Sequence, residues 1–420
     1  MTDGAATERL TPQPWMTAPA TLAVLRALAG GGAAARFVGG CVRDACIGRA
    51  VKDIDIATDA RPERVMELLK AAGIHAVPTG IEHGTVTAVS DHRPYEITTL
   101  RRDVSTDGRR AVVAFTDDWR EDAARRDFTF NAMSCTADGQ LFDYFDGRAD
   151  LAAGRVRFVG DAETRIREDV LRLLRFFRFN AHYGRPPLDP DGLAACVRLA
   201  PMLPGLSGER LAQETLRLLG APNPVAIVAL MAERGIVAAY LAEARRIAVL
   251  QALVTIEGIT LGADPVRRLA ALLEGGTTAA LAAAERLRLS IAQRERLVAL
   301  AAPVAALTPD LAPADRRRAF NRLDDALRAD LVLLGWAMAS AGAGGRLSRQ
   351  DTEGWQELLE QARAWQRRTM PVKGRDALAL GAAPGPALGA LLDELEAWWE
   401  AGDFAADRDR CLAELKRRLQ

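Results

Sequence analysis

The chain has 420 residues, of which 49% are hydrophobic, and its 55 basic residues balance 55 acidic ones. This length and composition predict a globular protein with roughly two to four subdomains, and the zero net charge means that any nucleic-acid surface must be a local patch. Residues 1–30 lack a basic segment and no run approaches about 18 apolar residues, so we expect neither export nor a membrane span and predict a cytoplasmic location.

Along the chain, a loose N-terminal extension is expected to lead into a helix over 21–29. Between residues 36 and 159 the pattern is mixed, and after residue 159 Ala, Leu, Arg and Glu recur at helical spacing to the end. A small sheet flanked by helices and followed by a long helical region is therefore predicted. The expected elements of the mixed region are strands over 36–38, 52–57, 84–90, 95–100 and 135–144, and a helix over 61–72 that begins with Pro62.

The most informative pattern is the pair Asp53 and Asp55. In a strand, residues two apart project from the same face, which leaves Ile54 and Ile56 on the opposite, buried face. Mg²⁺ commonly combines one or two carboxylates with phosphate oxygens, and two ions about 4 Å apart can activate a hydroxyl and stabilise a leaving pyrophosphate. The pair therefore indicates metal-dependent nucleotidyl transfer. The alternative is the solvent-facing side of an edge strand.

A glycine turn precedes the aspartates. The strand over 36–38 runs into Gly39 and Gly40, and a helix is expected from Cys41. Backbone N–H groups at such a helix start attract phosphates, and the guanidinium of Arg43 could add charge. The chain has no Gly-x-x-x-x-Gly-Lys and no Gly-x-Gly-x-x-Gly motif, so the common P-loop and dinucleotide explanations fail. We predict a triphosphate site at this turn.

Two residues compete for the role of a third catalytic carboxylate. Glu96, in the strand over 95–100, is preferred, although an exposed polar strand residue is an equally good interpretation. Asp127 is the competitor, and for it we favour a role in capping a helix or orienting an arginine. Arg126 would then meet triphosphate oxygens.

Base recognition is predicted at Asp169 and Arg172. In an ideal helix, Asp169, Arg172 and Arg175 share one face, whereas Arg178 drifts to the far side. A carboxylate accepts from an exocyclic amine and a guanidinium donates to a ring nitrogen, so one Asp/Arg pair could accept cytosine and adenine while rejecting uracil and guanine. An ordinary ion pair on a packed helix is the alternative.

These motifs occur in a fixed order that resembles the class II tRNA nucleotidyltransferases, the bacterial CCA-adding enzymes and their poly(A) polymerase relatives. The resemblance is dense over residues 36–220. It implies an α+β fold in which a small polymerase-β-like nucleotidyltransferase sheet (the head) is followed by an all-helical neck, body and tail. The expected divisions are an extension over 1–21, a head over 22–160, a neck over 161–240, and a body and tail over 241–420. The motifs are Gly-Gly-x-Val-Arg-Asp (39–44), Asp-x-Asp (53–55), Arg-Arg-Asp-Phe-Thr-x-Asn-Ala (125–132), Asp-Gly-x-x-Asp-Leu (146–151), Glu-Asp-x-x-Arg-x-x-Arg (168–175) and Glu209-Arg210 near Glu214.

The resemblance also implies site residues and partners. Asp53 and Asp55 would bind Mg²⁺. CTP and ATP would be the substrates and tRNA the acceptor, with no obligate protein partner indicated. Residues 104–116 fall where the family has a flexible loop that helps to switch from C to A addition. The nucleotide-binding residues would be Gly39, Gly40, Arg43 and Arg126 at the triphosphate, and Asp169, Arg172, Arg175 and Arg178 at the base.

Residues 78–87 look more like the CCA-adding branch, so CCA addition to tRNA is favoured. The close rivals are a poly(A) polymerase and an enzyme that adds only CC or only A. An inactive RNA-binding scaffold is a rival of another class, and the presence of both Asp53 and Asp55 argues against it. A small-molecule nucleotidyltransferase is the remaining alternative.

Overall fold

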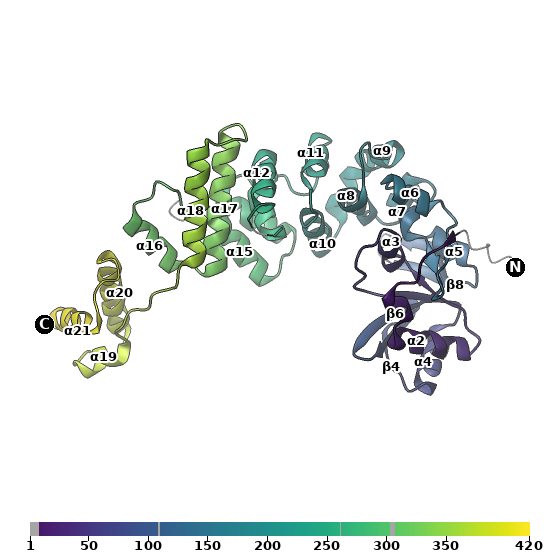
Figure 1. Ribbon diagram of the computed structural model, residues 1–420, viewed down its shortest axis with the longest axis horizontal. Helices are drawn as coiled ribbons and strands as arrows, with labels where there is room; N and C mark the ends of the chain where they lie inside the picture. Colours follow the sequence, from purple (N-terminus) through teal and green to yellow (C-terminus); the bar gives the residue numbers. More distant parts are fainter. Residues whose placement is uncertain (1–7, 108–109, 261, 303–306) are drawn as a thin grey trace. The chain divides into compact units, whose positions relative to one another are not determined.

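The computed structural model describes residues 8–107, 110–260, 262–302 and 307–420, and the side chains of 103–113 lie outside this description. The chain divides into two compact units, Met1–Ala242 and Glu243–Gln420 (Figure 1). The predicted α+β fold is confirmed, and every named element from residue 160 onward is a helix. The finer division into extension, head, neck, body and tail stays a prediction.

An eight-stranded mixed sheet forms the centre of the first unit. Its strands β3 and β6 are parallel neighbours, whereas β2 pairs with β3 in the antiparallel sense. A separate two-stranded sheet consists of β7 (Arg101–Asp107) and β8 (Arg110–Phe115), and the tip at 108–109 lies outside the described residues. In spatial order the large sheet contains β1 (Glu8–Arg9), β10 (Gln140–Phe142), β9 (Ser134–Cys135), β2 (Ala35–Val38), β3 (Asp55–Thr58), β6 (Arg93–Thr99), β5 (Thr85–Ser90) and β4 (His75–Gly80).

Helices pack around this sheet and continue beyond it. α2 and α4 contact each other and β5, while α10 packs along α8 (Figure 1). Three short 3₁₀ helices are η1 (Ile81–His83), η2 (Thr129–Asn131) and η3 (Ala200–Gly205). The α-helices of this unit are α1 (Pro14–Thr17), α2 (Pro19–Gly30), α3 (Gly40–Cys46), α4 (Pro62–Ala71), α5 (Trp119–Ala124), α6 (Gly147–Ala153), α7 (Ala162–Glu168), α8 (Leu171–Tyr183), α9 (Pro190–Leu199), α10 (Gly208–Leu219) and α11 (Val225–Glu233).

Most predicted elements exist, but two strand predictions were wrong in extent. The strand expected over 52–57 begins only at Asp55, because its partner β2 pairs as far as Phe37 opposite Ile56 and then turns into α3. The segment 135–144 forms two short strands, because Gly139, with φ +91°, turns the chain between them. The prediction missed β4 and the β7–β8 hairpin.

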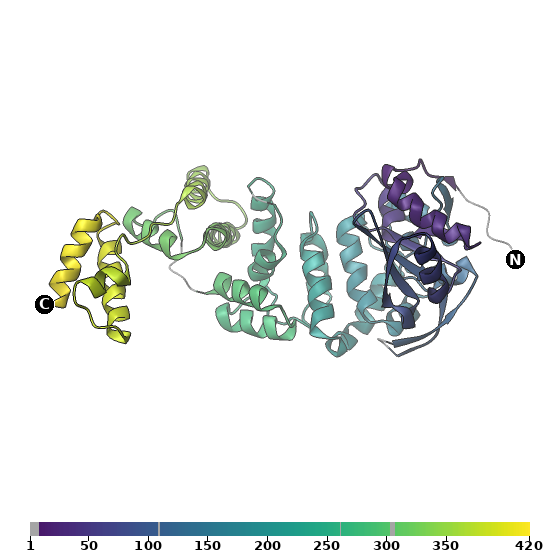
Figure 2. The same ribbon diagram turned by 90° about the horizontal axis from the view of Figure 1, so that it is seen from below.

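The second unit is a succession of helices. α17 and α18 lie side by side as an antiparallel pair, and both are seen end-on in Figure 2. None of the helices in the described parts of the chain has the length and apolar character needed to cross a membrane. The helices are α12 (Ile247–Glu257), α13 (Pro265–Leu272), α14 (Gly276–Arg286), α15 (Ile291–Ala301), α16 (Pro313–Arg322), α17 (Asp325–Gly342), α18 (Arg349–Ala364), α19 (Gly374–Ala379), α20 (Pro386–Ala401) and α21 (Arg408–Leu419).

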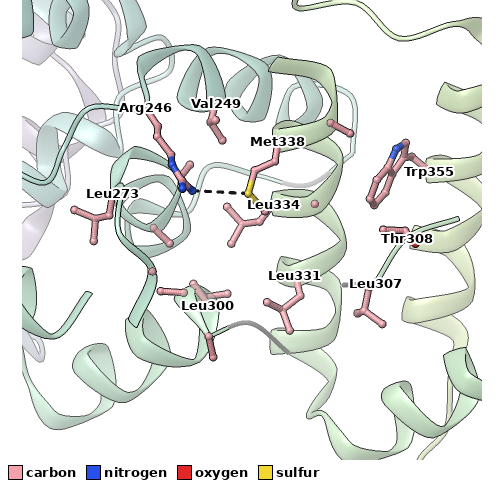
Figure 3. A pocket seen from close by; sticks show the side chains of 17 residues that line it. Arg246, Val249, Leu273, Leu300, Leu307, Thr308, Leu331, Leu334, Met338 and Trp355 are labelled. Carbon is pink, nitrogen blue, oxygen red and sulfur yellow. Dashed lines mark hydrogen bonds between the residues drawn. The ribbon is translucent and has the colours of Figure 1, made fainter. Parts of the chain in front are cut away.

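A cavity of about 540 Å³ lies among α12, α13, α15, α17 and α18 (Figure 3). Its described lining is mostly apolar, and the guanidinium of Arg246 approaches the sulfur of Met338 at 3.9 Å. Ala302 and Leu307, which flank residues outside the description, both line it. The carboxylates that the sequence predicts to be catalytic lie in the first unit, whereas this cavity lies in the second.

A buried ion network joins the helices of the second unit. Glu257, on α12, accepts from Arg267 at 2.6 Å and from Arg268 at 2.6 Å. Arg267 also reaches Asp330 on α17 at 2.6 Å, and Asp330 accepts from Arg296 on α15 at 2.6 Å. Because buried charges are tolerated only when they are paired and hydrogen-bonded, this network fixes how the four helices pack.

We predict that Glu257→Gln lowers the free energy of unfolding of the second unit by about 3–5 kcal/mol, because it removes the one negative charge that two buried guanidinium groups share. Urea denaturation followed by circular dichroism measures the loss. The matched control is Glu353→Gln, which removes a carboxylate from an exposed pair with Arg349 and should cost about 0.5 kcal/mol or less. Equal effects of the two variants would contradict the role given to the network.

Candidate active site

The carboxylates meet where β3 and β6 run side by side. The register places Asp55 directly opposite Glu96. Ile54 and Ile56 are buried, as predicted, but Asp53 lies in the bend before β3 rather than in the strand. Burial, together with the nearby charge of Glu96, raises the pKa of Asp55 to about 6, and Asp53 acts in the same direction. A group of negative charges held this closely favours a bound cation.

The glycine turn brings an arginine to the same place. Gly39 has φ +70°, a conformation that side chains other than glycine rarely adopt. A Cβ atom on Gly39 would lie 3.2 Å from Nη1 of Arg126 and 4.0 Å from Oδ2 of Asp55. The turn, the guanidinium of Arg126 and the carboxylate of Asp55 therefore surround one small space, and the charge of Arg126 opposes the rise in the pKa of Asp55.

Sequence reasoning missed the residue that holds Arg126. Asp122, on α5, accepts from Arg126 at 3.1 Å and forms an ion pair with Arg125 at 2.8 Å. Burial alone would raise the pKa of Asp122, but the two guanidinium groups outweigh it and keep the pKa below its ordinary value. The spacing was a usable signal, because an aspartate three and four residues before two arginines on a helix can reach both.

The structure separates the two candidates for the third carboxylate. Glu96 is exposed and faces Asp55 across the parallel pair. Asp127 is buried and accepts from Arg175 at 2.7 Å, from the Nδ2 amide of Asn131 at 2.9 Å and from the backbone of Phe128 at 2.8 Å. Its oxygens are thus occupied by donors. The catalytic role of Glu96 stays a prediction, and this geometry favours it over Asp127.

Arg43 is also engaged within the protein. It is buried, and it donates to Asp44 at 3.0 and 3.1 Å and to Oδ1 of Asn131 at 2.8 Å. One of its terminal nitrogens would nevertheless lie 3.7 Å from a Cβ atom on Gly40. The predicted contact of Arg43 with triphosphate stays a prediction, and Arg126 is the arginine that the structure places beside Gly39 and Asp55.

The expectation that Asp169 and Arg172 lie on one helix was wrong, whereas their role in base recognition stays a prediction. Asp169 ends α7 in an extended conformation, whereas α8 begins at Leu171, so the two residues do not share one helix. Asp169 accepts from Arg210 at 2.8 and 2.9 Å, and Arg172 donates to Glu168 at 2.7 Å. Both side chains belong to the same junction of α7 and α8, but each has its own partner.

Arg178 also lies elsewhere than expected. It donates to Glu214 on α10 at 2.6 Å, and Arg175 approaches the same carboxylate at 3.8 Å. The two arginines therefore converge on one carboxylate rather than pointing to opposite sides of α8. The error came from judging Arg178 against Asp169, which lies outside α8, whereas Arg175 and Arg178 are one three-residue step, about 60° around the axis, apart within α8.

The site fits a divalent metal ion that is completed by substrate. In the described part of the chain, no group of three His, Cys, Asp or Glu side chains is arranged to hold a metal ion by itself. Mg²⁺ seldom uses an all-protein cage and takes phosphate oxygens as further ligands. Asp53 and Asp55, with Glu96 beside them, supply hard oxygen donors in that incomplete form.

Comparisons with known proteins agree with this geometry. Residues 35–157 match the family described as "Poly A polymerase head domain", and residues 187–245 match "Probable RNA and SrmB- binding site of polymerase A". The mitochondrial CCA tRNA nucleotidyltransferase 1 of Mus musculus is 34% identical over 91% of this chain and 86% of its own length. The CCA-adding enzyme of Geobacillus stearothermophilus is 40% identical over 51% of this chain and 52% of its own length.

A solved structure extends the match over nearly the whole fold. The crystal structure of the Bacillus stearothermophilus CCA-adding enzyme in complex with CTP superimposes with a TM-score of 0.74 at 27% identity, covering 95% of this chain and 97% of that one. The fold and the carboxylate site thus define a nucleotidyltransferase. The chain belongs to the family of CCA tRNA nucleotidyltransferases.

We predict that Asp127→Asn lowers the free energy of unfolding by about 2–3 kcal/mol at pH 7, because it weakens a charge-assisted hydrogen bond to Arg175. Burial would raise the pKa of Asp127, but Arg175 and Asn131 outweigh it and hold the pKa below the ordinary value. A depressed folded-state pKa means that the carboxylate adds stability above about pH 4 and that this contribution is lost as the pH falls through the folded value.

The difference in the free energy of unfolding between wild type and Asp127→Asn should therefore shrink when urea titrations are repeated at steps from pH 7 down to pH 3. The exposed Asp117→Asn is the control and should differ from wild type by about 0.5 kcal/mol or less throughout. A difference for Asp127→Asn that is absent at pH 7, or that is unchanged at pH 3, would contradict this account.

Proposed function

We propose that the protein adds C, C and A to the 3′ end of tRNA, using CTP and ATP in a Mg²⁺-dependent reaction without a nucleic-acid template. The observation that carries the proposal is the register of β3 and β6, which sets Asp55 opposite Glu96 beside Arg126 and the Gly39 turn. Similarity to the mitochondrial CCA tRNA nucleotidyltransferase over most of both chains supports it. The cytoplasmic location stays a prediction.

The protein's part in the chemistry is positioning and charge neutralisation. Asp53 and Asp55 would hold Mg²⁺, which when bound activates the terminal 3′-hydroxyl and neutralises phosphate charge. The Gly39–Gly40 turn, whose two residues carry no side chains of their own, would receive the triphosphate, with Arg126 beside it. The hydroxyl attacks the α-phosphate and pyrophosphate leaves. Asp122 would keep Arg126 aimed at the leaving group.

Base recognition is proposed at the junction of α7 and α8. The carboxylate of Asp169 and the guanidinium of Arg172 carry the donors and acceptors that match cytosine and adenine. Because Asp169 is paired with Arg210 and Arg172 with Glu168, a bound base has to exchange with these protein partners. Arg175 and Arg178, both near Glu214, would support the pocket from the next turns of α8.

Extension of labelled tRNA transcripts tests the function directly. Three acceptors are needed: one without CCA, one without the final A, and one complete. Each is incubated with Mg²⁺ and CTP, ATP or both, and the products are resolved to single nucleotides. We expect two C additions, then one A, then a stop. A long A ladder would assign a poly(A) polymerase, C-only or A-only addition would assign a split activity, and no extension would point to a scaffold.

We predict that Glu96→Gln lowers the rate of nucleotide addition by about 100-fold or more, because it removes negative charge beside the metal-binding aspartates, while tRNA binding is unchanged. Single-turnover kinetics and a filter-binding assay measure the two quantities. The control is Glu67→Gln, an exposed glutamate of α4 that pairs with Arg64. A nearly silent Glu96→Gln would remove Glu96 from the catalytic set.

A further inference from the structure

A chain of buried polar side chains links η2 of the head to α3. Asn131 is its centre, because its Nδ2 amide donates to Asp127 at 2.9 Å and its Oδ1 accepts from Arg43 at 2.8 Å. Asp127, Asn131 and Arg43 are exposed by only 7%, 6% and 8%. Because the nitrogen and the oxygen of its side-chain amide are both hydrogen-bonded, Asn131 holds an acidic and a basic partner at fixed positions. Buried networks that are fully satisfied in this way are rigid.

Both ends of this chain return to the same helix, α8. At one end, Asp127 accepts from Arg175 at 2.7 Å. At the other, Arg43 donates to Asp44, and Asp44 accepts from the hydroxyl of Tyr183 at 2.8 Å. Arg175 and Tyr183 are eight residues apart, which corresponds to roughly 12 Å along a helix. We call the path Arg175, Asp127, Asn131, Arg43, Asp44 and Tyr183 the polar relay.

Aromatic rings lie against the charged members of the polar relay. The guanidinium of Arg43 lies 4.4 Å from the ring centre of Tyr183 and 5.2 Å from that of Phe179. The guanidinium of Arg175 lies 5.3 Å from the same Phe179 ring. These contacts restrict the two arginines further, since a cation over an aromatic face is attracted to it. The relay therefore fixes α3 on α8 at two separate points.

The two helices that the relay joins carry different parts of the proposed site. α8 carries Arg172 in its first turn, next to Asp169. α3 begins at Gly40, beside the turn that faces Arg126 and Asp55. The relay is thus a continuous hydrogen-bonded path between the two helices that carry these parts. α3 and α8 can be followed in Figure 1.

We propose that the polar relay couples recognition of the base at α8 to alignment of the triphosphate at α3, with Asn131 and Tyr183 as its positioning residues. The inference rests on the proposed function, and specifically on base reading by Asp169 and Arg172. It assigns positioning roles to Asn131 and Tyr183, which the proposed function leaves without one. Its consequence is that breaking the relay lowers incorporation of the correct nucleotide more than that of the wrong one, because only the correct base engages α8.

The test is single-turnover incorporation of CTP and of UTP on tRNA that lacks CCA, with Asn131→Ala and Tyr183→Phe. We expect kcat/KM for CTP to fall about 10-fold in Asn131→Ala, the size of effect that loss of a buried hydrogen-bond partner produces, while the value for UTP changes by less than about 2-fold. Tyr183→Phe removes one hydroxyl, keeps the ring over Arg43 and should change the CTP/UTP ratio in the same direction.

A matched control is Tyr144→Phe, which removes a different tyrosine hydroxyl of the first unit, one that accepts from Arg36 at 3.3 Å. It should leave the CTP/UTP ratio unchanged. Because Tyr183→Phe is a milder change than Asn131→Ala, it keeps the test valid if Asn131→Ala does not fold. An unchanged ratio in Tyr183→Phe, with CTP and UTP falling equally, would mean that the relay only stabilises the fold and would overturn the inference.

A double-mutant cycle measures the coupling itself. Asp169→Ala should abolish most of the selectivity for CTP, and adding Tyr183→Phe should then cost little more, because the base no longer acts on α8. If the fold-losses of the two single variants in kcat/KM for CTP simply multiply in the double variant, the coupling is overturned. Failure of the wild-type protein to add C or A at all is a different result, since it would refute the proposed function before any variant is made.

Discussion

The pairing of β3 with β6 is the constraint on which the rest of the active site depends. Parallel strands in fixed register set Asp55 opposite Glu96, and burial with that second carboxylate raises the pKa of Asp55 to about 6. Like charges on directly paired residues of neighbouring strands are stabilised by positive charge nearby. The fold supplies part of it through Arg126, which Asp122 holds beside the Gly39 turn, and leaves the remainder to a cation and its substrate.

Arginines around the site are held by acidic partners rather than left in solvent. Arg126 is held by Asp122, Arg172 by Glu168, Arg175 by Asp127 and Arg178 by Glu214. Such pairs fix the direction of each guanidinium before a nucleotide arrives, which lowers the entropy lost when the transition state forms. At the proposed base site, a bound base would have to replace the protein partners of Asp169 and Arg172.

Local patterns predicted much of the head. The glycine turn, the helix after it, the Pro62 helix and the buried Ile54 and Ile56 follow from rules that act within a few residues, and the structure has them. Asp53 was misplaced because the end of β3 is set by its partner β2, which is distant in sequence. Asp169 and Arg172 were wrongly placed on one helix because the chain breaks before α8, where Asp169 contacts Arg210 of the distant α10. The charged partner of Asp127, Arg175, likewise comes from the distant α8, so no local pattern identified it.

Diffraction from crystals grown with CTP and Mn²⁺ would test the central claim most directly, because the anomalous signal of Mn²⁺ locates the ion. The account predicts an ion about 2.1 Å from carboxylate oxygens of Asp53 and Asp55 and shared with the phosphates of CTP at the Gly39–Gly40 turn. CTP bound at that turn with the ion held by other side chains, or CTP bound away from β3 altogether, would contradict it.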